Sequence, residues 1–449
     1  MDRRAYLTTA AVTAGLAIAG CTGSGDREDQ SVDGVDDSED VGEEAVEGEQ
    51  DDEDADETDE GENTEDETDE EDGDDGDEDE DENEEAENHP SIVGTFDDFE
   101  DEGPWQEFLG SMSVDTERSA IGSQSVVMEP NERGTARIRR ELDEPIDTSE
   151  VAPGLATTAD GPGWALIQLQ DPDGNYHEYG QYMPGGTPMV RKNFGLTRVR
   201  GDPDPDRVTL IQFVRWYAGS ASRFWVDDLH FVPEPDRGKV ALCFRGGHES
   251  HRQQALSILR EHGITGTALV PTEAIGGGGA TMSPAQVDDL AQAGWTIGGY
   301  GARGRRLTGL GDGQLDREVV QSAAWLDERG HEGPRVFAFP DAQYDADSYE
   351  LVRNHYDIAF AERSRSQGYA ANPHLWTAAE SPTDPEEATE LVDWAADIGG
   401  ITTIPFEGLG GESLAALEAT LDRIDERVAA GELDVVTPAE MANQYVFQE

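Results

Sequence analysis

The order of hydrophobic and polar positions divides the chain into parts of different character. Over residues 90–235, short runs alternate apolar and polar residues, as at 165–170, 208–214 and 224–231, and turn-forming residues such as those at 171–174 separate them. Successive side chains of a strand point to opposite faces, so this alternation predicts half-buried β-strands. Many short strands without a helical period predict an all-β, jelly-roll-like sandwich.

From residue 237 to the end, apolar runs alternate with amphipathic segments. The pattern predicts strands at 239–244, 265–270, 295–299, 335–339, 357–361, 401–405 and 433–436. Helical spacing of apolar residues predicts helices at 250–262, 284–293, 315–329, 345–354, 385–396, 413–430 and 438–445. Strands that alternate with helices form mainly parallel sheets, so we expect a closed or nearly closed (β/α) barrel over 237–449.

The first 21 residues have the pattern of an export signal. Arg3 and Arg4 precede an apolar stretch over 8–20, which is too short to cross a bilayer of roughly 30 Å as a helix. The start resembles a twin-arginine signal, and Ile-Ala-Gly-Cys at 18–21 resembles a lipoprotein box. We therefore expect export and an outward-facing membrane anchor by lipidation of Cys21. In a plain signal peptide, Cys21 would have no role.

Acidic residues dominate the next segment and the folded part alike. Residues 22–89 contain 39 acidic residues, one basic residue and no aromatic residue, which predicts a disordered linker. The remaining 360 residues still carry a net charge of −32, and the chain has two lysines against 29 arginines. This balance is typical of a halophile, because a Debye length of about 3 Å at molar salt screens self-repulsion. We expect no nucleic acid partner.

One segment near the start of the predicted barrel carries a family motif. Residues 239–247, Lys-Val-Ala-Leu-Cys-Phe-Arg-Gly-Gly, predict a buried strand that runs into a glycine turn. This segment resembles the first motif of the polysaccharide deacetylase family (the NodB homology domain), in which the strand ends Thr-Phe-Asp-Asp-Gly. The segments 263–270, 283–298, 337–345 and 433–438 are also similar to the family. The resemblance implies a distorted (β/α) barrel and hydrolysis of N-acetyl groups of polysaccharide.

The family's catalytic groups are missing at the aligned positions. The family holds a divalent metal with one aspartate and two histidines, and it uses a second aspartate as base and a late histidine as acid. The resemblance aligns these five groups with Gly246, Tyr300, Gly304, Arg245 and Glu407, respectively. Glycine offers no ligand atom and arginine stays protonated. We therefore expect an inactive barrel without a catalytic divalent metal.

Another metal site near the barrel mouth would keep the enzyme active. His248 and His251 follow the first predicted strand, and Asp341 follows the fourth. If these three converged, they could hold a metal for an active hydrolase that removes acetyl groups. The alternative is that polar residues at a helix start serve in capping and solvation.

Arginines stand at or near the mouth of the predicted barrel. Their forked donors suit carboxylate or sulfate groups, so the mouth could bind acidic glycans. The competing interpretation pairs them with nearby acids such as Glu407 or Asp341. The candidates are Arg245, Arg303, Arg305 and Arg306.

The predicted sandwich resembles carbohydrate-binding modules at 96–101, 122–126 and 226–229. Because the first and last strands of such modules lie side by side, Asp97, Asp98 and Asp228 could share a structural calcium ion, or they could be solvated surface carboxylates. Exposed aromatic residues could stack on sugars, although most aromatic residues of a sandwich belong to its core. The aromatic candidates are Trp105, Tyr176, Tyr179, Tyr182 and Trp216.

Together these patterns predict an exported, lipid-anchored protein that recognises cell-surface or extracellular polysaccharide. Its partners would be a glycan and, through the anchor, the membrane. Two other functions remain open: an active hydrolase with an unorthodox metal site, and a structural or interaction module of the cell envelope.

Overall fold

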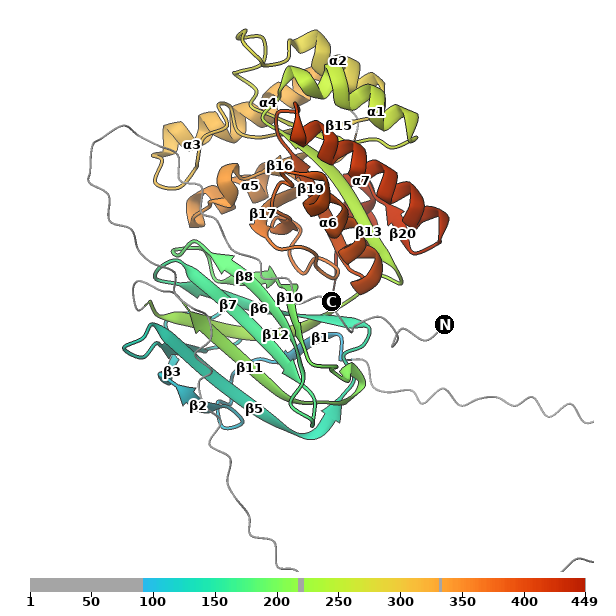
Figure 1. Ribbon diagram of the computed structural model, residues 1–449. Coiled ribbons are helices and arrows are strands. Elements are labelled where there is room, and N and C mark those ends of the chain that lie inside the picture. The colour runs from blue at the N-terminus through green and yellow to red at the C-terminus, as the bar shows by residue number, and fades with distance from the viewer. Residues whose placement is uncertain (1–91, 217–221, 331–332, 449) are drawn as a thin grey trace, which may run out of the picture. The chain divides into compact units, whose positions relative to one another are not determined.

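The computed structural model describes residues 92–216, 222–330 and 333–448, which belong to one compact unit of the chain. Two antiparallel sheets precede a parallel sheet with helices, which confirms the predicted fold class, a β-sandwich followed by a distorted (β/α) barrel (Figure 1). The predictions for the export signal, Cys21 and the acidic linker fall on residues outside the described part. None of the helices in that part has the length and apolar character needed to cross a membrane.

Two antiparallel sheets form the sandwich. The first has the order β3-β4-β12-β6-β9 with β1 beside β12, and the second has the order β10-β8-β7-β11-β5-β2. The prediction that the first and last strands lie side by side is confirmed, because Gly94 of β1 pairs with Phe231 of β12. The strands of the first sheet are β1 Gly94–Asp97, β3 Ser111–Asp115, β4 Ser125–Glu129, β6 Val151–Ala159, β9 Val190–Asn193 and β12 Phe224–Pro233. Those of the second sheet are β2 Gln106–Leu109, β5 Thr135–Ile146, β7 Gly163–Gln170, β8 Tyr176–Met183, β10 Gly195–Arg200 and β11 Val208–Trp216.

Alternate residues of the central strands fill the interior of the sandwich. On β7, Ala165, Ile167 and Leu169 are buried in the hydrophobic core. Trp164 and Leu166, which precede Ala165 and Ile167 in sequence, are only half-buried and point to the other face. The alternation in the sequence therefore corresponds to an inner and an outer face of the sheet, as the pleat of a strand requires.

The parallel sheet has the order β18-β17-β16-β15-β14-β13-β19, and β20 also pairs with β13. The backbone N–H of Ala379 donates to the carbonyl oxygen of Thr403 at 2.9 Å, which joins the chain after β18 to β19 and nearly closes the barrel. The strand β18 was not predicted. The strands are β13 Gly238–Arg245, β14 Thr267–Val270, β15 Thr296–Gly299, β16 Val336–Ala338, β17 Ile358–Arg363, β18 Trp376–Ala378, β19 Ile401–Phe406 and β20 Leu433–Val435.

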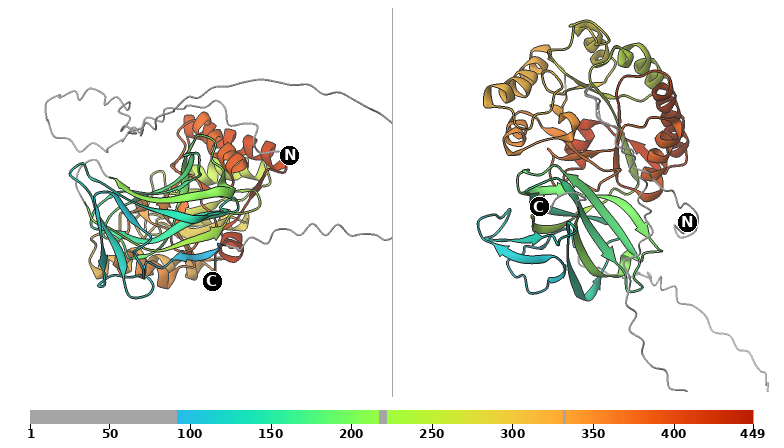
Figure 2. Two further views of the ribbon diagram at one scale, coloured as in Figure 1. Left: turned by 90° about the horizontal axis from the view of Figure 1, so that it is seen from below. Right: turned by 60° about the vertical axis from the view of Figure 1, so that its left-hand side comes forward.

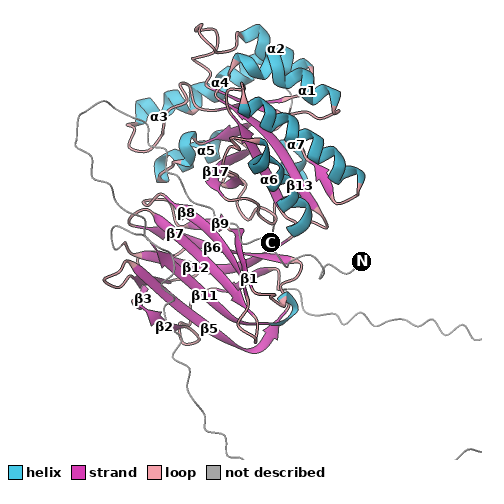
Figure 3. Cartoon of the chain, in the orientation of Figure 1, coloured by secondary structure: helices cyan, strands magenta, loops and turns pink. Residues whose placement is uncertain are grey.

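Helices surround the parallel strands (Figures 2 and 3). Capping boxes at Ser283, Asp345 and Thr437 start α2, α5 and α8. The predicted helix over 315–329 is two helices, because the backbone at Val319, with φ −102° and ψ −60°, interrupts it. The helices are η2 His251–Ala255 (a π-helix), α1 Leu256–Glu261, α2 Pro284–Gln292, α3 Asp312–Glu318, α4 Val320–Arg329, α5 Ala346–His355, α6 Pro385–Ile398, α7 Glu412–Ala429 and α8 Pro438–Gln444, with 3₁₀ turns η1 Pro205–Arg207 and η3 Pro340–Ala342.

Strand β13 is buried on both of its faces. Val240, Leu242 and Phe244 belong to the hydrophobic cluster between the sheet and the helices. Ala241 and Cys243 belong to the cluster inside the barrel. A strand covered on both faces is apolar at successive positions, which explains why the sequence predicted this strand so clearly.

We expect Phe244→Ala to destabilise the folded protein by about 3–5 kcal/mol, since it would leave a cavity in the packed core. The ring is fully buried and lies against Trp295 and Phe406, with centroids 4.8 and 5.6 Å away. Urea unfolding at constant molar salt measures the change. Phe108→Ala is the matched control, because its ring is 51% exposed and its loss should change the free energy of unfolding little. Equal effects of the two variants would contradict the packing argument.

Candidate functional site

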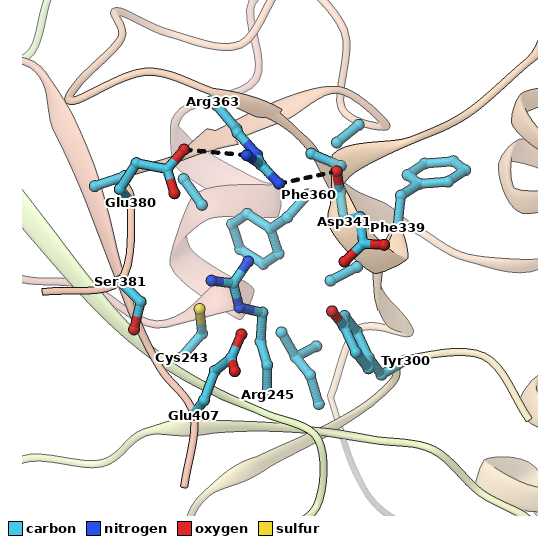
Figure 4. A pocket seen from close by; sticks show the side chains of 16 residues that line it. Cys243, Arg245, Tyr300, Phe339, Asp341, Phe360, Arg363, Glu380, Ser381 and Glu407 are labelled. Atoms are coloured by element: carbon cyan, nitrogen blue, oxygen red, sulfur yellow. Dashed lines mark hydrogen bonds and ion pairs between the residues drawn. The ribbon is translucent and has the colours of Figure 1, made fainter. Parts of the chain in front are cut away.

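A pocket with a cavity volume of about 150 Å³ lies where the parallel strands of the barrel end. Its walls come from the carboxyl-terminal parts of β13, β14, β16, β17 and β18 and from residues directly after β15 and β19. Sites of (β/α) barrels lie at this end, because strand ends and the loops that follow them converge there. Figure 4 shows the lining side chains that can carry chemistry: Cys243, Arg245, Tyr300, Asp341, Arg363, Glu380, Ser381 and Glu407.

Arg245 extends from the end of β13 into this pocket (Figure 4). The strand ends there because Gly246 and Gly247 follow with φ of 91° and 63°, a left-handed backbone that favours glycine. The Nε atom of Arg245 is buried and has no hydrogen-bond partner. A buried donor without an acceptor costs roughly 1–3 kcal/mol, so Nε is suited to an acceptor supplied by a ligand.

The other side of the pocket is held by a second arginine. Arg363 donates to the backbone oxygen of Asp341 at 3.1 Å and to the carboxylate of Glu380 at 3.2 Å (Figure 4). Asp341 and Ala342 have φ of 58° and 51°, which is strained for residues with side chains. Tyr300 faces this wall, and burial raises the pKa of its hydroxyl, which therefore stays neutral at neutral pH. The pocket thus combines cationic donors, a neutral hydroxyl and carboxylate acceptors.

The other arginines that the sequence placed at the mouth are in ion pairs and do not line the pocket. Nε of Arg303 donates to Glu273 at 2.8 Å, and Nε of Arg305 donates to Glu318 at 2.8 Å. Arg306 lies 3.4 Å from the carboxylate of Asp341. The competing interpretation, pairing with nearby acids, describes these arginines. Arg245 differs, because it has no ion pair in the described part of the chain.

A buried glutamate binds two of these arginines and so holds the segment that contains them. The side chain of Glu318 is fully buried, and it also accepts a hydrogen bond from the backbone N–H of Arg303 at 2.8 Å. Arg305 neutralises the charge of this carboxylate, since an unpaired buried charge would be costly. No sequence pattern indicates this role, because a glutamate on a helix is ordinarily solvent-exposed.

The residues at the family's metal positions do not fit a divalent metal. Gly246 and Gly304 carry no ligand atom, and their φ of 91° and 69° would strain a residue with a side chain. A Cβ atom on Gly246 would lie 2.8 Å from Nε2 of His248, and one on Gly304 would lie 3.3 Å from the ring of Tyr300. The space for ligand side chains is thus already filled. The cation of Arg245 at the base position opposes a metal further.

The residues of the alternative metal site do not form a metal-binding group. His251 is fully buried, its Nε2 atom lies 2.8 Å from the backbone oxygen of Glu407, and its ring packs on Phe244. Asp341 pairs with Arg306, and His248 pairs as an isolated β-bridge with Thr281. Within 92–216, 222–330 and 333–448, no group of three or more His, Cys, Asp or Glu could hold a metal ion. His251 faces the core because it begins a helix that packs on the sheet.

The proposed calcium ligands bind other groups. Asp97 pairs with Arg140 and accepts a hydrogen bond from Nε1 of Trp105 at 2.8 Å. Asp228 pairs with Arg191 at 2.5 Å. Asp98 accepts from the backbone N–H two residues later, as in a local turn. The first and last strands bring these carboxylates close in the sheet, but arginines take the place that a calcium ion would need.

The aromatic candidates of the sandwich divide into core and surface residues. Trp105 is buried and stacks on Phe99 and Phe213, with centroids 5.4 and 4.5 Å away, and Tyr179 is also buried in the core. Burial raises the pKa of Tyr179. These two residues cannot stack on a sugar. The half-buried Tyr176 and Tyr182 and the 44% exposed Trp216 can.

Some pocket residues escaped the sequence analysis. Glu380 and Ser381 follow β18, which was not predicted, so no pattern placed them at the mouth. Arg363 stands two residues beyond a predicted strand, at the end where barrel sites lie. Its position is the one signal that could have found it.

Parallel strands, surrounding helices and a pocket at the carboxyl ends of the strands define a (β/α) barrel with a ligand site. Residues 233–356 match the model of the family described as polysaccharide deacetylase, so they form a polysaccharide deacetylase domain, as the resemblance implied. The match covers β13 to α5. No curated protein matches the sequence.

Solved structures are similar to the chain at low identity. A peptidoglycan N-acetylglucosamine deacetylase shares 14% identity over 46% of this chain and 90% of its own, with a TM-score of 0.35. A family 4 carbohydrate esterase from Streptomyces lividans, in complex with acetate, shares 17% over 45% and 94%, with a TM-score of 0.31. A family 11 carbohydrate-binding module of a cellulosomal cellulase of Clostridium thermocellum shares 13% over 32% and 96%, with a TM-score of 0.26. The chain covers only 25% of the length of an exo-β-agarase that it also matches.

We predict that His251 makes stability depend on pH. Burial lowers the pKa of this histidine from 6.5 to about 4, so between pH 6.5 and 4 the unfolded chain binds a proton that the folded chain does not. The stability contributed by the neutral ring is complete above pH 6.5 and falls as the pH drops towards 4, by an amount on the order of 3 kcal/mol. Urea unfolding of the protein and of His251→Gln at several pH values measures it. Parallel pH profiles would contradict the assignment.

Restoring the family's residues should fail to restore a metal site. In the variant with Arg245→Asp, Gly246→Asp, Tyr300→His and Gly304→His, each replaced glycine should cost about 1–3 kcal/mol of backbone strain. We expect lower stability and no stoichiometric zinc by equilibrium dialysis. The double variant Arg245→Asp, Tyr300→His changes no glycine and is the control for strain. Tight zinc binding by the fourfold variant, without loss of stability, would contradict the fit argument.

Proposed function

We propose that this is an exported, lipid-anchored protein that recognises polysaccharide at the cell surface or outside the cell through a deacetylase-type barrel that does not hydrolyse its ligand. The observation that carries the proposal is the set of residues at the barrel mouth, which differ from the family's metal ligands and base. Two of the three positions aligned with the family's metal ligands hold glycines with left-handed backbone, and Arg245, at the aligned base position, presents an unmatched donor.

The absence of hydrolysis follows from the chemistry of the residues at the mouth. Attack on an N-acetyl carbonyl needs an activated water and a group that accepts its proton. Arg245 stands at the aligned base position, and a guanidinium group offers hydrogen-bond donors but no acceptor for a proton. Tyr300 is held neutral by burial, so it can donate a hydrogen bond but is a poor base. The mouth can therefore bind and orient a ligand, and the residues at the aligned metal and base positions do not supply an activated water.

A carbohydrate ligand is supported by the polysaccharide deacetylase domain at 233–356. Relatives of similar fold include proteins described as a peptidoglycan N-acetylglucosamine deacetylase and a carbohydrate esterase. A pocket of about 150 Å³ is small, which favours one substituent or the end of a glycan chain over a long oligosaccharide. Glu407 and Asp341 offer acceptors to sugar hydroxyl groups, as pockets for polar ligands commonly do.

An acidic substituent suits the pocket best. The guanidinium group of Arg245 forms no ion pair with the described residues, whereas Arg363 is already bound to Glu380. A carboxylate can accept two parallel hydrogen bonds from a guanidinium group, a geometry that gives specificity as well as energy. Such a contact is made at hydrogen-bond distance, so it survives at salt concentrations that screen long-range attraction. We therefore propose an acidic glycan as ligand.

Location at the cell surface rests on the sequence. The twin-arginine pattern, the short apolar stretch and Cys21 in a lipoprotein-like box support export and lipidation. A single lipid chain binds membranes only marginally and reversibly, so glycan binding would supply a second contact. The acidic linker would connect the anchor to the folded part, and its reach would depend on salt through charge repulsion.

The test uses the purified full chain at molar salt, with acetylated chitin oligomers for hydrolysis and an acidic polysaccharide column for binding. We expect no acetate release with added zinc, nickel or cobalt, and retention on the column. Arg245→Ala should weaken binding by about tenfold, because it removes a charge-assisted contact. Arg303→Ala is the matched control, since this arginine is paired with Glu273 outside the pocket.

Two outcomes would overturn the proposal. Stoichiometric bound metal together with acetate release would establish an active hydrolase. Failure of the full chain to bind any envelope glycan would leave a structural module of the envelope as the better description.

A further inference from the structure

The outer face of the second sandwich sheet carries aligned rows of side chains that the barrel pocket does not explain. The register places Trp216, Trp164 and Tyr182 in one row across the neighbouring strands β11, β7 and β8. None of the three belongs to the hydrophobic core cluster of the sandwich, and Trp216 is 44% exposed. We call this set the aromatic row. Its members are far apart in sequence, and only the strand register brings them together.

The aromatic row places three aromatic side chains on neighbouring strands, two of them in contact. The rings of Trp164 and Tyr182 meet edge to face, with centroids 5.7 Å apart and an interplanar angle of 72°. Adjacent strands lie about 4.8 Å apart, so three strands place the row along roughly 10 Å. One pyranose ring of an extended polysaccharide advances by a distance similar to one strand spacing. A linear glycan that runs across the strands therefore finds an apolar contact at successive sugar rings, whose C–H faces pack on aromatic side chains.

A second row on the same face, four residues along each strand, is polar. Gln212, Gln168 and Glu178 are register partners on β11, β7 and β8, and all three are buried. Nε2 of Gln168 donates to the carboxylate of Glu178 at 2.7 Å. Val214, Leu166 and Gly180 separate this row from the aromatic row. An aromatic row beside fixed amide groups is the composition of a site for a polar ligand with apolar faces.

Arginines lie on this face on both sides of the central strands, on β5 and on β10. Arg139 and Arg137 on β5 are the register partners of Gln212 and Val214, and Arg198 on β10 is the partner of Glu178. The Nε atoms of Arg137 and Arg139 are buried without a hydrogen-bond partner. Burial lowers the pKa of Arg137, so its charge is poorly solvated. Arg198 is exposed and has no ion pair among the described residues.

The charge of this face is opposite to that of the protein. The chain has a net charge of −69, yet these rows contribute Arg137, Arg139, Arg198 and Arg200 against two glutamates, Glu178 and Glu141. At molar salt such arginines do little for solubility or long-range steering, because charges are screened beyond a few ångströms. Contact at hydrogen-bond distance is the interaction with a carboxylate that remains effective there. Arg139 already lies 3.8 Å from the carboxylate of Glu141 on the same strand.

We propose that this face binds a linear, carboxylate-bearing polysaccharide, with the aromatic row under the sugar rings and Arg137, Arg139 and Arg198 on the carboxylates. This inference rests on the proposed function, because both assume a glycan ligand. It adds a second binding site and states that the ligand carries carboxylates. Two sites on one chain would bind a polymer with higher avidity than either alone.

Calorimetry of the full chain at molar salt with polygalacturonate, a linear polymer of uronic acid, tests the site. We expect saturable binding that weakens by about tenfold in Trp216→Ala and again in Arg198→Ala, the scale of one lost anchor contact. Methyl-esterified polygalacturonate keeps the rings and removes the charge, so it should bind at least about tenfold more weakly. Trp325→Ala on α4 and Arg353→Ala on α5 are matched controls, which should bind as the parent protein does.

Variants of the sheet face and of the barrel pocket distinguish the two sites. Unchanged binding by Trp216→Ala and Arg198→Ala, with loss in Arg245→Ala, would overturn this inference and leave the proposed function standing. Equal affinity for the charged and esterified polymers, or no saturable binding, would also overturn it. A synthetic peptide of residues 51–82 tests a third outcome. If the peptide quenches tryptophan fluorescence and Trp216→Ala abolishes the quenching, the face binds the chain's own acidic segment, which would also overturn the inference.

Discussion

The parallel pairing of strand β13 is the constraint on which the barrel mouth depends. This strand pairs with β14, β19 and β20, and both of its faces are buried. Its end is therefore fixed in space, and the glycine turn at 246–247 stops it at Arg245. The side chain of Arg245 therefore extends from the end of the strand into the pocket. The same pairing places Glu407, which follows β19, in the pocket that Arg245 enters.

The residues at the aligned motif positions depend on their neighbours. The ring of His248 lies beside Gly246, and the ring of Tyr300 lies beside Gly304, where a side chain would need space. Close packing makes substitutions at these positions interdependent, since an empty ligand site would be a cavity and a restored ligand would clash. Both glycines also adopt a backbone that other residues resist. A single reversion therefore cannot recover the family's chemistry.

Periodicity predicted most of the fold and little of the chemistry. The strands of β13 and β19 were found because continuous apolar runs mark strands buried on both faces. Burial of Trp105 and pairing of Arg303 with Glu273 could not be predicted, because both depend on contacts between residues remote in sequence. The resemblance predicted that Gly246 and Gly304 stand where the family has metal ligands. Their left-handed backbone and the side chains beside them are visible only in the structure.

The preference for arginine over lysine connects the two proposed binding sites. A lysine ammonium is a strongly hydrated point charge, while a guanidinium group is weakly hydrated and offers paired donors in one plane. In concentrated salt, attraction that acts over distance is lost and geometry at contact decides specificity. Arg245 in the pocket and Arg137 on the sheet both present buried, unmatched Nε donors, one at a strand end and one on a strand face. The guanidinium groups at both sites can therefore bind a planar carboxylate by direct contact in concentrated salt, where net charge has little effect on binding.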